Sequence, residues 1–175
     1  MIQYLILSII LVIVLALYWS TAVYGDLEKF EVSYNGNRLI GVPRLTIKDA
    51  LKSPYIKYPA ADLNALYTII MVDPDAPNTL PDHAYRHLMV VDIPGSKLQS
   101  GLGNVEGSGR LLTIYMPPRP PKGSGIHNYQ IRLYLQKSRW AEDPISEKRS
   151  NWPVELIAEK ANLYEIARKT FTVAS

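Results

Sequence analysis

The sequence predicts one mainly β domain over residues 26–175, preceded by a hydrophobic segment over residues 1–25. Short runs of apolar, β-branched and aromatic residues alternate with stretches rich in proline and glycine, as strands and loops do. The chain has thirteen prolines, ten glycines and twelve tyrosines in 175 residues, a composition typical of strands joined by long, shaped loops. The predicted strands do not alternate with long helices, which excludes a doubly wound α/β fold.

The apolar patterns predict where the main strands lie. Residues 66–72 are almost all apolar or β-branched, which predicts a central strand buried on both faces. A second central strand is predicted over residues 87–93, and residues 129–135 alternate like a strand with one solvated face. The shorter predicted strands are residues 30–34, 38–47, 55–58, 111–115 and 170–173.

Local signals predict one hairpin turn and one helix. Asn35-Gly36 follows an alternating segment, and this pair favours a two-residue hairpin turn. The helix is predicted to begin near Asn151, with Pro153 in its first turn and Glu155 at the positive end of its dipole. Its predicted apolar face comprises Leu156, Leu163, Ile166 and Ala167. Residues 95–110 are rich in glycine, serine and polar side chains and predict an exposed loop.

Composition and charge exclude several classes of function. The chain contains no cysteine, which excludes disulfides, thiolate catalysis and cysteine-based zinc sites. The net charge is +3, and the basic residues are interspersed with acidic ones, so no nucleic-acid partner is predicted. A domain of this length buries about 68–70% of its unfolded surface and can support a core without disulfides.

The hydrophobic N-terminus is expected to be a signal anchor or a signal peptide. Residues 5–19 are almost wholly apolar and show no polar face, unlike a helix packed on a globular core. The run is long for the core of a signal peptide and slightly shorter than the roughly 20 residues that span a membrane. Cleavage near Ala22 or Gly25 would release a secreted domain, and an uncleaved segment would anchor the domain in a membrane. The alternative is a hydrophobic strand or helix of the domain itself.

Candidate binding residues gather where predicted strands meet unusual loops. Asp73 and Asp75 follow a buried strand in the segment Asp-Pro-Asp-Ala-Pro, which two prolines make stiff. His87 begins another strand, and His127 and Tyr129 follow a glycine loop that lets the backbone approach a ligand. Imidazole, phenol and backbone N–H groups are donors suited to a phosphate or a carboxylate, while the aspartates would orient the imidazoles or contact an amine. These residues predict an anion site at one end of neighbouring strands.

Two motifs in this region resemble those of the phosphatidylethanolamine-binding proteins. The first is Tyr-Thr-Ile-Ile-Met-Val-Asp-Pro-Asp-Ala-Pro over residues 67–77, and the second is Pro-Pro-Lys-Gly-Ser-Gly-Ile-His-Asn-Tyr over residues 120–129. Between them, Arg-His-Leu-Met-Val-Val over residues 86–91 is similar to the strand that carries the pocket histidine of the family. The resemblance extends over roughly residues 30–173.

The resemblance implies a fold, a pocket and a role. The fold would be a β-sandwich with a large central antiparallel sheet, a smaller second sheet and a few peripheral helices. The pocket would bind a phosphorylated head group or small anion, without a cofactor or catalysis, and the role would be to inhibit or adapt an unknown protein partner. A cis peptide at Ala76–Pro77 is also expected. The ligand-binding residues carried over by motif are Asp73, Asp75, Pro77, His87, Pro121, Gly125, His127 and Tyr129.

The chain departs from the family pattern at two positions near this pocket. Arg119 stands where the family has a glycine before the proline pair, so it would narrow the pocket mouth or add a cation for the anion. Arg86 precedes His87, where animal members have another histidine or an aromatic residue.

An enzyme is the main alternative to a binding module. The His/Asp cluster suits general acid–base chemistry in a hydrolase, or a zinc ion held by His87, His127 and a carboxylate. Ser124 and Ser108 lie beside glycines, but no base is evident next to either. The motifs Gly-x-Ser-x-Gly, His-Glu-x-x-His and Gly-Lys-Ser/Thr are absent. A third hypothesis is a membrane-tethered structural domain with a vestigial pocket.

Overall fold

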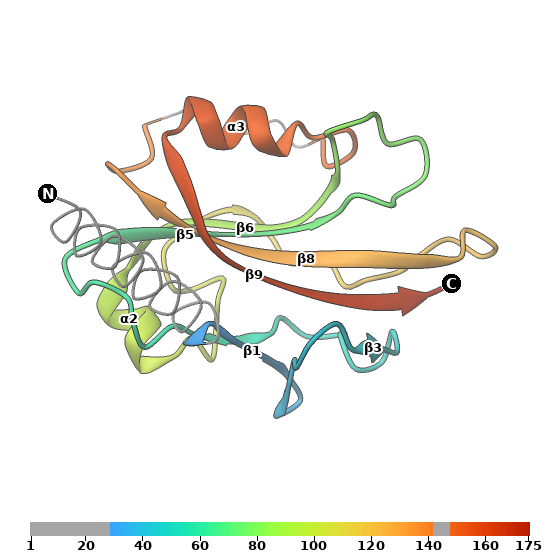
Figure 1. The fold of residues 1–175 in the computed structure, drawn as a ribbon, viewed down its shortest axis with the longest axis horizontal. Helices are drawn as coiled ribbons and strands as arrows, with labels where there is room; N and C mark the ends of the chain where they lie inside the picture. The colour runs from blue at the N-terminus through green and yellow to red at the C-terminus, as the bar shows by residue number, and fades with distance from the viewer. Residues whose placement is uncertain (1–28, 142–147) are drawn as a thin grey trace, which may run out of the picture.

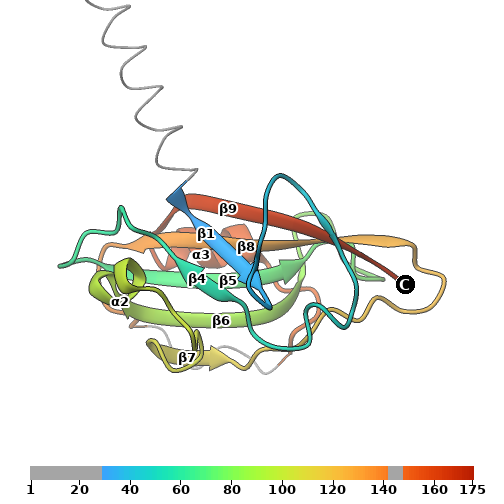
Figure 2. The ribbon, with the colours of Figure 1, turned by 90° about the horizontal axis from the view of Figure 1, so that it is seen from below.

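The computed structural model describes residues 29–141 and 148–175, so the expectations for residues 1–25 lie outside the described part. Within it, strands dominate and two short helices are present, α2 (Gly95–Ser100) and α3 (Val154–Lys160) (Figures 1 and 2). Neither helix is long and apolar enough to cross a membrane. The strands are β1 (Glu31–Tyr34), β2 (Asn37–Arg38), β3 (Arg44–Leu45), β4 (Tyr55–Lys57), β5 (Leu66–Asp73), β6 (Tyr85–Pro94), β7 (Arg110–Thr113), β8 (Ile126–Gln136) and β9 (Leu163–Ala174).

The strands form a large and a small sheet, which confirms the predicted fold class. The small sheet has the order β2-β1-β4, and the large one has the order β3-β9-β8-β5-β6-β7. All strand pairs are antiparallel except the edge pair of β3 with β9, which is parallel. The small sheet lies below one face of the large sheet in Figure 1, and α3 lies above the other face. The large sheet is therefore covered on both sides.

Strand β5 lies in the middle of the large sheet and supplies both of the hydrophobic cores around it. Ile69 and Met71 belong to the core that faces the small sheet, whereas Ile70 and Val72 belong to the core under α3. All four side chains are fully buried. The continuous apolar run follows from this position, because successive side chains of a strand point to opposite faces and here both faces are covered.

The hairpin turn is confirmed, and the two other loop expectations are wrong. Asn35 and Gly36 have φ values of 51° and 81° between β1 and β2, which the predicted two-residue turn requires. The Ala76–Pro77 peptide is trans, as are all peptide bonds of the described ranges, and trans is the favoured form even before proline. Residues 95–110 are not entirely a loop, because α2 forms there and buries Leu98 in the main core.

The predicted helix is shorter than expected, and the predicted last strand is longer. Helix α3 ends at Lys160, and β9 already begins at Leu163. Asn162 between them has a φ of 50°, a left-handed conformation that ends a helix and that asparagine tolerates. Ile166 is an extra residue in the pairing with β8, because Leu133 faces Ala167 and Tyr134 faces Glu165. With this extra residue, the apolar residues Leu163, Ile166 and Ala167 stand three and four positions apart, as on one face of a helix. The wrong helix prediction for this segment follows from that spacing.

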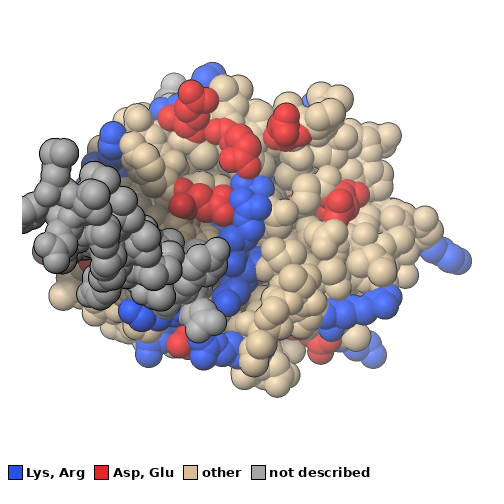
Figure 3. Space-filling view, viewed as in Figure 1, with Lys and Arg blue, Asp and Glu red and all other residues tan. Residues whose placement is uncertain are grey.

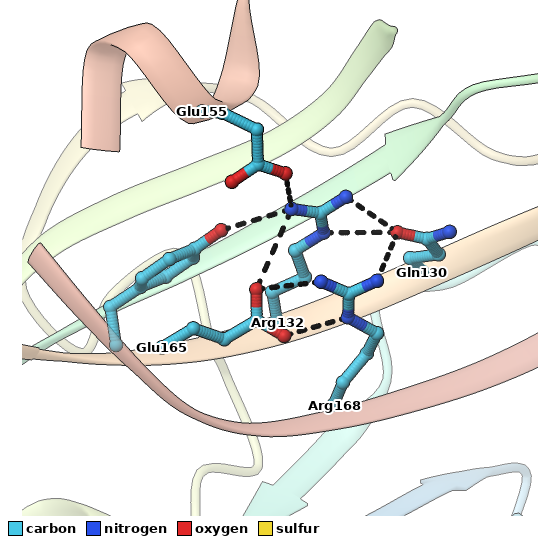
Figure 4. Close-up of polar contacts among 6 residues, drawn as sticks. Gln130, Arg132, Glu155, Glu165 and Arg168 are labelled. Atoms are coloured by element: carbon cyan, nitrogen blue, oxygen red, sulfur yellow. Dashed lines mark hydrogen bonds and ion pairs between the residues drawn. The ribbon is translucent and has the colours of Figure 1, made fainter. Parts of the chain in front are cut away.

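The second half of β8 is buried on both faces, although an alternating strand with a solvated face was predicted. Arg132 points toward α3 and is only 6% exposed, and polar groups surround its guanidinium (Figure 4). Its Nη1 donates to Glu155 Oε1 at 2.6 Å, and its Nε and Nη2 donate to Gln130 Oε1 at 3.0 and 2.7 Å. A second carboxylate, Glu165, lies 3.5 Å from the same Nη1. A buried cation needs such partners, so α3 covers a charged side chain here.

Figure 3 shows the molecule in space-filling view from the same side as Figure 1. Basic side chains form a short stripe near its middle, and acidic side chains lie directly beside them. Charges of opposite sign alternate on this face, so it carries no extended basic patch.

Replacing Asn162 with alanine is expected to lower the free energy of unfolding by about 1 kcal/mol, because alanine is strained in the left-handed region. Asn162 is exposed, so the change removes no buried contact. The matched control is Asn162→Gly, which fits the same φ and should stay within about 0.5 kcal/mol of the wild type. Urea unfolding of the three proteins measures the difference. Equal stability of the alanine variant and the wild type would contradict this explanation of how α3 ends.

Candidate anion-binding site

A cavity of about 600 Å³ opens beside the C-terminal end of β5 and the N-terminal ends of β6 and β8. The antiparallel register brings these ends together, because Val72 pairs with Arg86 on one side and with Gln130 on the other. The prediction that the ends of neighbouring strands meet at the site is therefore confirmed. Six of the eight predicted binding residues line the cavity, namely Asp73, Pro77, His87, Pro121, His127 and Tyr129.

The two other predicted residues lie outside the lining. Asp75 Oδ2 accepts hydrogen bonds from Asn128 N at 2.7 Å and from Asn128 Nδ2 at 2.8 Å. Its carboxylate thus joins the proline loop to β8. Gly125 has a φ of 87° and its carbonyl accepts from Ser175 N at 2.9 Å, so it shapes the loop that leads into β8.

The deepest part of the site is a hydrogen bond between His127 and Asp73. Nδ1 of His127 lies 2.7 Å from Asp73 Oδ2, and the two residues are only 1% and 3% exposed. A carboxylate accepts, so this nitrogen carries the proton. The other carboxylate oxygen, Oδ1, accepts from Asp75 N at 2.9 Å. Asp73 therefore has a partner on each oxygen and holds the imidazole in one orientation.

His87 also lines the cavity and is held by the backbone. Its Nδ1 lies 2.7 Å from the Met116 carbonyl oxygen, so Nδ1 is the donor and Nε2 of the neutral ring is an acceptor. Burial lowers the pKa of His87 below its ordinary value, and the Met116 hydrogen bond and the charge of Asp73 oppose this shift only in part. The ring packs edge-on against Tyr129, with centroids 5.2 Å apart.

Tyr129 and Arg119 also contribute polar side chains to the lining, as do Tyr85 and Ser150. Burial raises the pKa of the Tyr129 phenol well above its ordinary value, and the charge of Asp73 raises it further, so the hydroxyl stays neutral. Arg119 is exposed and lines the cavity.

Comparison with known proteins agrees with the two motifs. A family model described as "Phosphatidylethanolamine-binding protein" matches residues 22–172. The chain belongs to this family. The chain is 34% identical over 137 residues to "Protein BROTHER of FT and TFL 1" of Arabidopsis thaliana, covering 73% of the chain and 72% of that protein. It is 33% identical over 124 residues to "CEN-like protein 1" of Nicotiana tabacum, covering 69% of the chain and 66% of that protein.

Solved structures of the phosphatidylethanolamine-binding proteins share the fold. A carboxypeptidase Y inhibitor, solved in complex with its cognate proteinase, matches with a TM-score of 0.66 at 23% identity, over 88% of this chain and 92% of that one. The phosphatidylethanolamine-binding protein of Plasmodium vivax also matches with a TM-score of 0.66, at 18% identity and over 82% and 83% of the two chains. Because the sequence identities are below 25%, these two comparisons show a shared fold only.

Sequence reasoning missed one contact in this member of the family. No base was expected beside Ser124, but His127 Nε2 lies 2.8 Å from Ser124 Oγ. The only sequence signal was the spacing of a serine and a histidine three residues apart across a glycine. Ser108, the other serine in a glycine context, is buried and donates to Val105 O at 2.6 Å. Within the described ranges, no three His, Asp or Glu side chains are grouped so that they could hold a metal ion.

The lowered pKa of His87 predicts that the protein becomes less stable as the pH is lowered. Because folding disfavours protonation of this buried ring, the native state binds fewer protons than the unfolded state below the ordinary value of 6.5. The contribution of His87 is complete above that pH and is lost as the pH falls through it. His87→Gln should remove up to about 1.4 kcal/mol per pH unit from the slope of unfolding free energy against pH.

Urea unfolding between about pH 5 and 8 measures this slope for both proteins. The matched control is His83→Gln, since His83 lies outside the cavity and its Nδ1 contacts the Pro81 carbonyl instead. If the wild type and His87→Gln show the same slope, His87 is not held neutral by the fold.

Proposed function

We propose that this family member is a binding module that takes a small phosphorylated or other anionic group in the cavity and regulates a protein partner. The observation that carries the proposal is the gathering of His87, Arg119 and Tyr129 around one hollow, with His127 behind them. These side chains offer a guanidinium and an imidazole nitrogen to one guest, and the neutral Tyr129 phenol is hydrogen-bonded to Asp73 beside them. Ligand sites of this kind combine an apolar wall with a few convergent polar groups.

The charges around the cavity favour an anion. Arg119 supplies a cation at the mouth, and a guanidinium binds phosphate and carboxylate groups with paired hydrogen bonds. The negative charge of Asp73 is turned toward His127 and the backbone of Asp75, so it is partly compensated before a ligand arrives. An anionic guest thus meets the arginine without facing a bare carboxylate.

The state of His87 determines which part of a ligand it contacts. In the neutral ring Nε2 accepts, which suits the ammonium of phosphoethanolamine or a protonated phosphate oxygen. Protonation at lower pH converts the same atom into a donor toward a dianion. A zwitterionic head group offers both kinds of group and therefore fits the lining better than inorganic phosphate alone.

A regulatory role rests on family membership. The carboxypeptidase Y inhibitor of similar fold acts on a proteinase with which it was solved, so this architecture is compatible with a protein partner. A pocket that accepts a head group would make the contact with that partner dependent on the ligand.

Titration of the full-length protein with phosphoethanolamine should shift the NMR signals of His87 and His127. His87→Ala and Arg119→Ala should each weaken binding about tenfold, because each removes a polar or charged contact with the ligand. His83→Ala is the matched control and should bind like the wild type. Inorganic phosphate as a second probe separates recognition of the head group from recognition of phosphate alone. Unchanged affinity in both cavity variants would show that the ligand does not bind there.

We also propose that residues 1–25 direct the domain to a membrane or out of the cytosol. The basis is the uncharged, apolar run over residues 5–19. Fractionation of cells that express the chain with a C-terminal tag should recover it in membranes, or outside the cell with a new N-terminus near Ala22 or Gly25. An intact chain in the soluble cytosolic fraction would contradict the proposal.

A further inference from the structure

Two residues that line the cavity, Asp73 and His127, form a continuous hydrogen-bonded chain with Ser124, which lies outside the lining. Ser124 Oγ lies 2.8 Å from His127 Nε2, and His127 Nδ1 lies 2.7 Å from Asp73 Oδ2. A hydroxyl, an imidazole and a carboxylate connected in this order are the arrangement that activates serine in hydrolases, and the arrangement recurs on unrelated folds. Binding of an anion makes no use of the serine.

We propose that Ser124 is a nucleophile that takes an acyl group from an ester, with His127 as its general base and Asp73 as the residue that positions the imidazole. The proposal is independent of what binds in the cavity. It adds a chemical activity to a site that otherwise only holds a ligand.

The protonation pattern of the imidazole suits this role. Because Asp73 accepts from Nδ1, the neutral ring presents a free lone pair at Nε2, toward Ser124. The Ser124 hydroxyl also lies 2.6 Å from the Pro121 carbonyl oxygen, so its single proton has two possible acceptors. Turning the proton to Nε2 leaves no buried group unpaired, since Pro121 O still accepts from Ser124 N at 3.0 Å. The reactive orientation therefore costs little.

The base and the residue that positions it are buried, whereas the serine is exposed, as catalysis by an activated serine requires. His127 and Asp73 are almost wholly buried, so water does not compete for the base, whereas Ser124 is exposed. The glycines on either side, Gly123 and Gly125, have φ values of 84° and 87°, and a Cβ added to either would meet no atom within 4 Å. A substrate can therefore reach the hydroxyl over an unobstructed turn.

The reaction balances without any further reagent except water. The Ser124 oxygen bonds to the ester carbonyl carbon, and its proton passes to His127 Nε2. The bond from that carbon to the alcohol oxygen breaks, and the departing alkoxide takes the proton from Nε2, leaving an acylated serine. Water then attacks the acyl carbon while His127 Nε2 takes one of its protons. The bond from that carbon to Ser124 Oγ breaks, and Oγ takes the proton back from Nε2, which releases a carboxylic acid and restores both residues.

The test is reaction of the full-length protein with a fluorophosphonate, which phosphonylates activated serines, followed by mass spectrometry of the peptides. We expect Ser124 to be modified and the modification to disappear in Ser124→Ala. Asp73→Asn should slow it about a hundredfold, as expected when a general base loses its correct orientation. The matched control is Ser100, an exposed serine whose hydroxyl donates to Ser96 O at 3.0 Å.

A purely structural serine that only braces His127 would behave differently. Modification of Ser124 no faster than that of Ser100, or equal rates in Asp73→Asn and the wild type, would overturn the proposal. If Asp73→Asn does not fold, His127→Gln replaces it with the same expected loss. A pH profile of the wild-type rate adds a second readout, since reaction through a neutral imidazole must slow as the pH falls. Ser124→Ala should still bind phosphoethanolamine, so the outcome separates reactivity from binding.

Discussion

The hydrogen bond between Asp73 and His127 is the constraint on which the site depends. It joins the end of β5 to the start of β8 at 2.7 Å, at a place where both side chains are excluded from water. Removing one partner of a buried hydrogen bond typically costs about 1–3 kcal/mol, because the remaining polar group is left without water or another partner. The interaction therefore holds the proline loop and the glycine loop in one relative position. The cavity, the serine contact and the orientation of the imidazole all follow from that position.

Other groups around the cavity are likewise held by the protein itself. Asp75 is fixed by Asn128, and His87 is fixed by the Met116 carbonyl. The Met116 contact satisfies a buried nitrogen of His87 that would otherwise be costly, whereas Asp75 is exposed and its contacts serve to fix the loop. The parts of the site left for a guest are the exposed Arg119 side chain and one nitrogen of His87, because the Tyr129 phenol is already hydrogen-bonded to Asp73. Because the rigid groups are prearranged, a ligand would lose little free energy in ordering its site.

The opposite face of the large sheet is organised by charge as well as by apolar packing. Arg132 rises from the middle of β8 into the space under α3, where Glu155 comes from the helix and Glu165 from β9. Figure 4 shows these side chains converging on the guanidinium. A cation buried in this way helps to orient the helix over the sheet, since a displaced helix would remove the Glu155 carboxylate, the nearer of its two acidic partners. The two faces of β8 thus serve different purposes: Ile131 and Leu133 pack in the main core, and Arg132 positions α3.

The amino-acid sequence alone determined the mainly β class, both central strands, the Asn35-Gly36 turn and six of the residues that line the cavity. These follow from properties carried by a few neighbouring residues: apolar runs, turn chemistry and two specific motifs. Tertiary structure decided where α3 ends and β9 begins, because eleven residue pairs with β8 and one bulge outweigh the helical spacing of Leu163, Ile166 and Ala167. It also decided that Asp75 braces a loop and that Ser124 has an imidazole beside it. The Asp75 contact joins segments that are far apart in the sequence, and the Ser124 contact depends on Asp73, on another strand, to orient the imidazole, so local sequence patterns encode neither.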